Sequence, residues 1–322
     1  MERDNLPRWD GRRGRYEVWF LTMTHGRLGY WIRYTLRTPI AGPPEREVWF
    51  ARFDRDAPER SFGVHGPAQG EVGPRGYFDV GECLIEPGVA RGRIAGHGHE
   101  ARWDVRWEPG QPTVRILPPI LHRTGLASTK PLTPNPEARF TGVIEGDGDR
   151  VDLDGAPGQQ SHVYGTRHAE RWAWASCSRF ADDRWAFQAL SAQARRWPFL
   201  SPFLTFAVLR MDGRWVRFRG TSRRRAWGLG VWPLDLEAGD HRLEGEVRAP
   251  LEHLIRARYL DPDDTPRFSH NTEVASARLI LWERRMGGWQ QAAELLSQGT
   301  THAEWAGRTP APGVNMIHQE VA

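Results

Sequence analysis

Short runs in which every second residue is apolar recur along most of the chain, and this alternation constrains the fold more than any other feature of the sequence. Residues 17–23, 30–37 and 47–53 form three such runs, separated by segments that contain Gly or Pro. Alternation over such lengths is typical of strands with one buried face. The spacing therefore predicts antiparallel strands joined by short turns.

Further runs of this kind extend the pattern into both halves of the chain, whereas helical periodicity is rare. The segment 289–298, which follows Gly287 and Gly288, is the best candidate for a helix. Strands this short, with turn residues between them, are typical of barrels and sandwiches. We therefore expect an all-β fold. The additional predicted strands are 77–86, 89–95, 99–107, 139–145, 171–180, 185–192, 203–210, 214–219, 226–236, 241–248, 252–260 and 274–284.

Two segments interrupt the alternation and suggest how the chain divides. Residues 109–136 are rich in Pro, and residues 146–160 are rich in Gly and Asp. We place a domain boundary near residue 150, which gives an amino-terminal β domain over 1–150 and a carboxy-terminal β domain over 151–322. Each would hold roughly eight strands, which is enough to close a barrel around one small ligand.

Charge and hydropathy exclude several classes of protein. The 44 Lys and Arg are balanced by 40 Asp and Glu, and the longest basic run is Arg223–Arg225, so we expect no nucleic-acid partner. No stretch has eighteen consecutive apolar residues and the start of the chain lacks an apolar core, so we expect neither a transmembrane segment nor a secretory signal. Cys83 and Cys177 are far apart in sequence, and we expect buried thiols in a cytoplasmic protein.

The sequence predicts no metal site and no cofactor. The acidic run that begins at Asp147 lacks the Gly and Glu that a calcium-binding EF-hand loop needs at its sixth and twelfth positions. The histidines of 96–99 are expected at a hairpin tip, with no third ligand nearby. Nucleotide-binding, zinc-protease and serine-hydrolase motifs do not occur in the sequence.

The segment 160–180 carries the most chemical information. His162, Tyr164 and His168 precede a Trp-x-Trp pair at Trp172 and Trp174. On a strand, the two tryptophans would share one face, as would His162 and Tyr164. Polar, titratable groups beside an aromatic wall are typical of a small-molecule site. The alternative is a hydrogen-bonded His and Tyr pair that closes one end of a barrel, and the residues leave both interpretations open.

With the phenylalanine that ends it, this segment resembles the signature of the AttH-like, lipocalin-type superfamily, which includes carotenoid 1,2-hydratases, tocopherol cyclases and some Diels–Alderases. The segment 268–275 resembles the late motif of that family, and 29–34 resembles its opening strands. The resemblance extends over most of the chain. It implies two lipocalin-like antiparallel β-barrel domains packed together, with a ligand cavity near their junction.

The resemblance also implies a type of chemistry, with one departure. Hydratases and cyclases protonate an alkene, which requires a carboxylic acid that stays protonated in an apolar site. The family motif places an acid close to the glycine before the Trp-x-Trp pair, whereas here no carboxylate follows Gly165 until Glu170. Glu170, Glu273 and Glu304 are the candidates to replace it. A pericyclic reaction would need no acid, because a shaped cavity can hold the reacting groups together.

We therefore expect a protein that binds a hydrophobic terpenoid, isoprenoid or polyketide-like molecule and catalyses a cyclisation, isomerisation or hydration without a cofactor. Two alternatives remain: a non-catalytic carrier of an apolar ligand, which the missing motif acid favours, and an interaction protein with filled barrels. The expected catalytic residues are His162, Tyr164, His168 and Glu273, and the expected ligand-binding residues are Trp172, Trp174, Arg179, His270 and Asn271.

Overall fold

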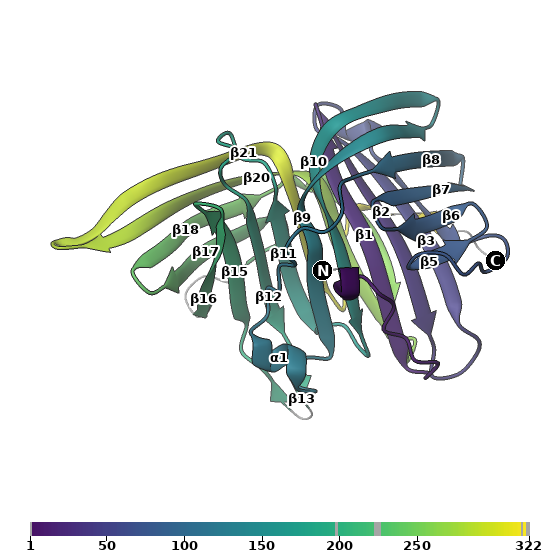
Figure 1. Cartoon of the computed structure of the whole chain (residues 1–322), viewed down its shortest axis with the longest axis horizontal. Helices are drawn as coiled ribbons and strands as arrows, with labels where there is room; N and C mark the ends of the chain where they lie inside the picture. The colour runs from purple at the N-terminus through teal and green to yellow at the C-terminus, as the bar shows by residue number, and fades with distance from the viewer. Residues whose placement is uncertain (1, 197–198, 222–226, 317, 320–322) are drawn as a thin grey trace. The chain divides into compact units, whose positions relative to one another are not determined.

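The computed structural model describes residues 2–196, 199–221, 227–316 and 318–319, and nearly every element in it is a strand (Figure 1). The described elements that are not strands are a short helix, α1 (Pro119–Arg123), and three single 3₁₀ turns at Glu2–Asp4, Pro58–Arg60 and Leu251–His253. The all-β fold expected from the alternation is therefore confirmed. The run Arg223–Arg225 lies outside the described residues.

The chain divides into two compact units. The first contains Met1–His168, Arg258–Pro266 and Met316–Ala322, and the second contains Ala169–Ala257 and Arg267–Asn315. Residue 150, where the sequence suggested a boundary, lies inside a hairpin whose second strand continues to Gly165 and pairs along the first unit. The Gly and Asp of this region form the hairpin turn, with positive φ at Asp147 and Gly148.

The first unit is one large sheet that curls until β4 lies beside β7 and β8. Its strand order is β23-β4-β3-β2-β1-β10-β9-β8-β7-β6-β5, and all neighbours are antiparallel except the pair of β23 with β4. The strands are β1 (Arg15–His25), β2 (Leu28–Thr38), β3 (Glu45–Asp54), β4 (Phe62–Pro67), β5 (Phe78–Val80), β6 (Cys83–Glu86), β7 (Val89–Gly96), β8 (His99–Arg106), β9 (Thr129–Gly146), β10 (Asp149–Gly165) and β23 (His318–Gln319).

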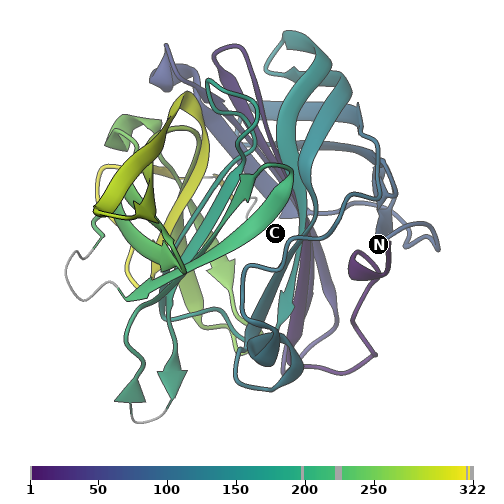
Figure 2. The same ribbon diagram turned by 60° about the vertical axis from the view of Figure 1, so that its left-hand side comes forward.

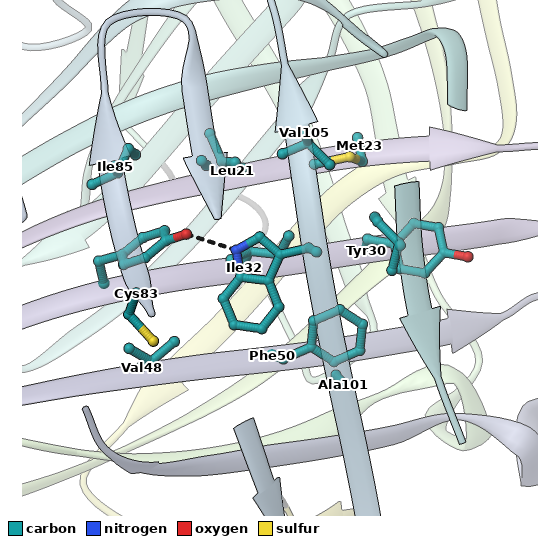
Figure 3. Packing of buried hydrophobic residues seen from close by; sticks show 14 of the residues in the cluster. Leu21, Met23, Tyr30, Ile32, Val48, Phe50, Cys83, Ile85, Ala101 and Val105 are labelled. Carbon is teal, nitrogen blue, oxygen red and sulfur yellow. Dashed lines mark hydrogen bonds between the residues drawn. The ribbon is translucent and has the colours of Figure 1, made fainter. Parts of the chain in front are cut away.

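Aromatic and aliphatic side chains from this curled sheet fill its concave side, as Figure 3 shows for labelled residues of β1, β2, β3, β6 and β8. Trp103 and Trp107, at alternate positions of the predicted strand 99–107, both belong to this core. The indole N–H of Trp103 donates to the hydroxyl of Tyr34 at 2.6 Å, and that hydroxyl donates to the carbonyl of Arg91 at 2.7 Å. The large ring is thus buried with its polar atom satisfied.

The second unit is a closed barrel (Figure 2). Its strands follow the order β18-β17-β16-β15-β12-β11-β21-β20, and β20 pairs back onto β18. They are β11 (Arg171–Cys177), β12 (Phe187–Gln193), β15 (Leu204–Met211), β16 (Arg214–Thr221), β17 (Val231–Ala238), β18 (His241–Arg248), β20 (Pro266–Arg285) and β21 (Gly288–Gly307). The remaining short strands are β13 (Arg195–Arg196), β14 (Phe199–Leu200), β19 (Ile255–Leu260) and β22 (Asn315–Met316).

Closure of the barrel depends on a glycine in β18. Gly245 pairs with Leu279 on β20 and has a φ of 150°, and a Cβ atom there would lie 2.0 Å from the carbonyl oxygen of Arg278. A side chain at this position would push the two strands apart, so glycine permits their close approach.

The helix predicted over 289–298 is wrong, because this segment belongs to β21 in the long hairpin that β21 forms with β20 (Figure 1). Gly287 and Gly288 have φ values of 109° and 119° and form the hairpin turn instead of preceding a helix. Leu295 is buried and Leu296 is exposed, which is the alternation of a strand. Pairing with β20 overrides the helical propensity of the segment.

Two further expectations concern cysteines and membranes. Cys83 and Cys177 are free and buried, as expected from their spacing. Within the described ranges, the structure has no helix that combines the length and the apolar character needed to cross a bilayer.

Candidate functional site

The predicted site residues of β10 lie in the first unit, where His162 is part of a buried polar network. Its Nε2 lies 2.8 Å from Oε1 of Glu17 and its Nδ1 lies 2.5 Å from the carbonyl oxygen of Asp4. The ring stacks on Trp19 with centroids 5.0 Å apart, and the side chain is fully buried. Both ring nitrogens therefore face protein oxygen atoms.

Tyr164 lies next to His162, with ring centroids 5.4 Å apart. Burial raises the pKa of its hydroxyl, so the phenol stays protonated at neutral pH. The guanidinium of Arg8 lies 5.8 Å from the ring centroid. Tyr164 also lines a cavity of about 20 Å³, which has room for about one water molecule.

His168 connects the end of the β10 segment to residues of the discontinuous stretch 258–266. Its Nδ1 and its backbone N–H both lie 2.8 Å from Oδ1 of Asp261. Its ring stacks on Tyr16 at 4.3 Å and on Tyr259 at 5.7 Å. The cavity beside it measures about 30 Å³, which is the size of a water site and too small for an organic substrate.

The Trp-x-Trp pair lies on β11 in the second unit and points away from the core of the barrel. Ala173 and Cys177 of this strand belong to that core. Trp172 and Trp174 alternate with them and are 7% and 6% exposed. The sequence pattern predicted that the two tryptophans share one face of the strand. Arg179 follows the strand and is exposed, and its carbonyl oxygen accepts hydrogen bonds from the Cys177 thiol and the Thr300 hydroxyl.

Strand pairing brings a set of polar side chains to the same outer face as Trp174. Trp174 is directly opposite Glu304 on β21, and Ser176 is opposite His302. On the other side of β21, Glu304 is opposite Asn271 on β20. Directly opposed residues share one face of a sheet. The outer face of β11, β21 and β20 thus combines tryptophan with acidic, imidazole and amide groups.

The geometry of this polar cluster centres on Glu273. Its Oε1 lies 2.6 Å from Nδ1 of His302, and the two side chains are 1% and 4% exposed. Oγ of Ser269 lies 2.5 Å from Oε1 of Glu304 and 2.9 Å from Oδ1 of Asn271. The cluster therefore holds two carboxyl groups, one of which is paired with an imidazole.

Burial controls the ionisation of this pair. It raises the pKa of Glu273 to about 7, against the opposing effect of the neighbouring His302. Burial alone would lower the pKa of His302, but the charge and hydrogen bond of Glu273 outweigh it and raise the pKa. The two groups share a hydrogen bond and therefore titrate as one coupled unit. A carboxylic acid that keeps its proton near pH 7 is suited to general acid catalysis.

His270 lies on the opposite face of β20 from Asn271 and Glu273, towards the interior of the barrel. Its Nδ1 lies 3.0 Å from the carbonyl oxygen of Trp305, and its Nε2 accepts the backbone N–H of Ala311 at 3.0 Å. Burial lowers its pKa, in agreement with a neutral ring that donates at one nitrogen and accepts at the other.

The structure thus distributes the nine predicted residues over distinct environments. Asn271, Glu273, Trp172 and Trp174 share the outer face of the second unit. His162, Tyr164 and His168 belong to the first unit. Sequence reasoning missed His302, although strand alternation over 301–305 places its side chain on the same face as that of Glu304. This alternation was missed because the preceding segment, 289–298, was predicted to be a helix.

Metal ligation has no support within the residues described: they contain no group of three or more His, Cys, Asp or Glu placed to hold an ion. Gly96–His99 forms the turn between β7 and β8, where His99 Nδ1 lies 2.6 Å from Oδ2 of Asp147.

Sequence comparison places the chain among known proteins. The family model described as tocopherol cyclase-like matches residues 136–306. An uncharacterized protein of Mycobacterium tuberculosis is 29% identical over 319 residues, which cover 96% of this chain and 92% of the relative. The chloroplastic tocopherol cyclase of Zea mays is 26% identical over 157 residues, which cover 46% of this chain and 32% of the maize protein.

Solved structures share the fold. An AttH protein of Nitrosomonas europaea has a TM-score of 0.53 at 14% identity, covering 92% of this chain and 93% of that one. Kievitone hydratase from Nectria haematococca has a TM-score of 0.50 at 11% identity, covering 95% and 92%. CghA with Sch210972 has a TM-score of 0.55 at 12% identity, covering 91% and 88%. These similarities confirm the all-β, lipocalin-like fold that the sequence resemblance implied. Since the family model spans more than half of the sequence and includes β11, β20 and most of β21, the chain belongs to the tocopherol cyclase-like family.

Proposed function

We propose that the protein is a cofactor-independent cyclase or hydratase in which Glu273 donates a proton to an alkene of an apolar substrate. The observation that carries this proposal is the buried pair of Glu273 and His302, in which burial raises the pKa of the carboxyl group to about 7. Membership of a family that contains cyclases supports it. An acid of this kind was the component missing from the segment before Trp172.

The reaction needs a proton and no external oxidant or reductant. The carboxyl proton of Glu273 adds to one alkene carbon, and the π electrons form the new C–H bond. The cation left on the other carbon is attacked by a hydroxyl group of the substrate in a cyclisation, or by water in a hydration. The attacking oxygen then releases a proton, which returns to the Glu273 carboxylate directly or through His302.

Aromatic and polar neighbours have separate roles in this scheme. Trp172 and Trp174 share the outer face with the acid, and their rings are suited to stabilise a developing carbocation. Ser269, Asn271 and Glu304 orient the substrate or the attacking oxygen. We assign His162 and His168 a structural role in the first unit. Both ring nitrogens of His162 and Nδ1 of His168 contact protein oxygen atoms.

Deuterium labelling tests the proposal. Prenylated phenols and quinols would be incubated with the protein in D₂O, and the products analysed by mass spectrometry and NMR. The wild type should introduce one deuterium at carbon, and Glu273→Gln should lower turnover by about 10² to 10⁴-fold, the usual contribution of general acid catalysis. Glu294→Gln is the matched control, because Glu294 lies on the neighbouring strand β21, is partly exposed and pairs with Arg278.

Two outcomes would contradict the proposal. Turnover by Glu273→Gln at the wild-type rate would remove the acid from the mechanism, and product without deuterium at carbon would favour a pericyclic reaction. An apolar molecule that co-purifies with the protein and is recovered unchanged after incubation would instead support the carrier interpretation.

A further inference from the structure

A second site of different chemistry lies at one end of the barrel of the second unit. The cavity measures about 470 Å³ and is bounded by the start of β11, the ends of β12 and β21, and the segment 308–311. Barrel mouths of this size commonly hold small ligands. His270 and Trp305 line it, and they lie on the inner side of the strands whose outer side carries Glu273. The cavity is therefore separate from the proposed proton donor.

The wall of this cavity has an excess of positive charge. The residues that line it include one carboxylate, Glu170, and three guanidinium groups, those of Arg171, Arg195 and Arg308. Arg195 Nε donates to Glu170 at 2.9 Å and Arg308 Nη2 donates to it at 3.0 Å. Three guanidinium groups against one carboxylate leave two positive charges uncompensated among the lining residues. Arg267, which is fully buried 3.7 Å from Glu170, adds to the positive field.

Arg171 is the guanidinium best placed to receive a ligand. Its carbon Cζ lies 4.7 Å from the ring centroid of Trp227 and 5.5 Å from that of Phe203. In the described part of the chain, no carboxylate forms an ion pair with Arg171. A guanidinium stacked on rings is held in place while its N–H groups stay available for bidentate binding of an anion.

The rest of the wall is apolar. Trp227, Leu229 and Trp305 line the cavity, and Leu200 extends it towards the rim. Phe199, the neighbour of Leu200 on β14, is 74% exposed. A donor-rich cationic patch beside a continuous apolar surface is complementary to a molecule with one anionic end and one apolar end.

We propose that this barrel mouth binds a free single-chain amphiphile whose anionic oxygen head, a carboxylate or a phosphate, contacts Arg171 and Arg308 and whose chain lies on Trp227, Leu229 and Leu200. The cavity volume favours one chain over a two-chain lipid. The site goes beyond the proposed proton-transfer reaction and shares none of its residues, so either proposal can fail alone.

Binding of matched C12 probes tests this site. Dodecanoate, dodecanol and dodecylammonium would be titrated into the full chain by calorimetry at concentrations below micelle formation. We expect dodecanoate to bind at least tenfold more tightly than the other two. Arg171→Gln should weaken dodecanoate binding about tenfold or more, because it removes a charge-assisted hydrogen bond. Arg285→Gln, at the distant hairpin tip, should leave binding unchanged.

Further variants locate the site and guard against loss of the fold. Leu229→Glu places a negative charge in the wall and should abolish binding, while Glu273→Gln should bind dodecanoate like the wild type. Thermal melting of each variant shows whether it is folded. Absence of dodecanoate binding, equal affinity for dodecanol, or wild-type affinity in folded Arg171→Gln would each overturn the proposal. Binding to phosphatidylglycerol vesicles without binding of free dodecanoate would also overturn it, in favour of a membrane headgroup.

Discussion

Nε2 of His162 lies 2.8 Å from Oε1 of Glu17 across the pair of strands β10 and β1, in a part of the first unit that is closed to solvent. The same carboxylate accepts two backbone hydrogen bonds. Oε1 of Glu17 accepts the N–H of Arg8 at 2.6 Å, and Oε2 accepts the N–H of Trp9 at 3.1 Å. One side chain thus connects the segment before β1 to the sheet.

This network leads to a prediction about stability. His162→Ala should lower the free energy of unfolding by about 3 kcal/mol, because it removes one hydrogen bond of the buried Glu17 carboxylate and leaves a cavity beside Trp19. In a double-mutant cycle with Glu17→Gln, the two losses should be less than additive. Urea denaturation measures all four proteins. His241→Ala, at a partly exposed histidine, is the control and should cost less than about 1 kcal/mol. Strict additivity in the cycle would show that the pair is not coupled.

The raised pKa of Glu273 makes stability depend on pH. The carboxyl group binds its proton more tightly in the folded chain, with a pKa of about 7 against the ordinary glutamate value of 4.5. Its contribution to the free energy of unfolding is therefore fully present below pH 4.5 and is lost as the pH rises through 7. The shift corresponds to roughly 3 kcal/mol. The raised pKa of His302 acts in the same direction.

Thermal melts between pH 5 and 8 test this expectation. The wild type should lose stability over this range more steeply than Glu273→Gln, which cannot ionise at this position. Identical slopes for the two proteins would contradict the raised pKa of the buried carboxyl group.

The glycine at the closure of the barrel provides a third prediction. Gly245→Ala should destabilise the protein by about 2 kcal/mol or more, because its Cβ would collide with the backbone of β20 in a conformation that non-glycine residues avoid. Gly228→Ala is a suitable control, since a Cβ there meets no atom of the described residues within 4 Å and its φ is not positive. Chemical denaturation of both variants should separate them clearly, and equal stabilities would show that the strands can part at little cost.

The two cysteines should be unreactive in the native protein. Burial raises the pKa of both the Cys83 and the Cys177 thiol, which reduces the thiolate fraction as well as access. At pH 8, a thiol reagent such as DTNB should label neither residue until denaturant is added, when both should react. Rapid labelling of one thiol in the native protein would show that the surrounding unit opens locally.

Local alternation made much of the fold predictable. Residues 17–23, 30–37 and 47–53 form the centres of β1, β2 and β3, because the alternate positions that face the core of the first unit are apolar. The hairpin of β20 and β21 was harder to foresee. The outer part of this hairpin is exposed to solvent on both faces. The sequence of residues 289–298 therefore has helical propensity, and the segment adopts strand structure only because it pairs with β20.

The candidate site was predictable in part, for a related reason. The family resemblance indicated Asn271, Glu273 and Trp174, each within a recognisable motif. The partner of Glu273 is His302, which lies on another strand, and its place is set by the register of β20 against β21. Bulges between Thr272 and Ala277 alter that register, so sequence spacing alone does not give the contact.

The first unit is discontinuous in sequence, and this has a consequence for protein synthesis. Tyr259, which packs edge-on against Trp49 with centroids 5.7 Å apart, and Asp261, which binds His168, leave the ribosome only after β11 to β18 have been made. The edge strand β23 emerges after every other described strand. Domains usually fold in the order of their synthesis. Here the amino-terminal unit is begun first but cannot be completed until the strands of the second unit have been made.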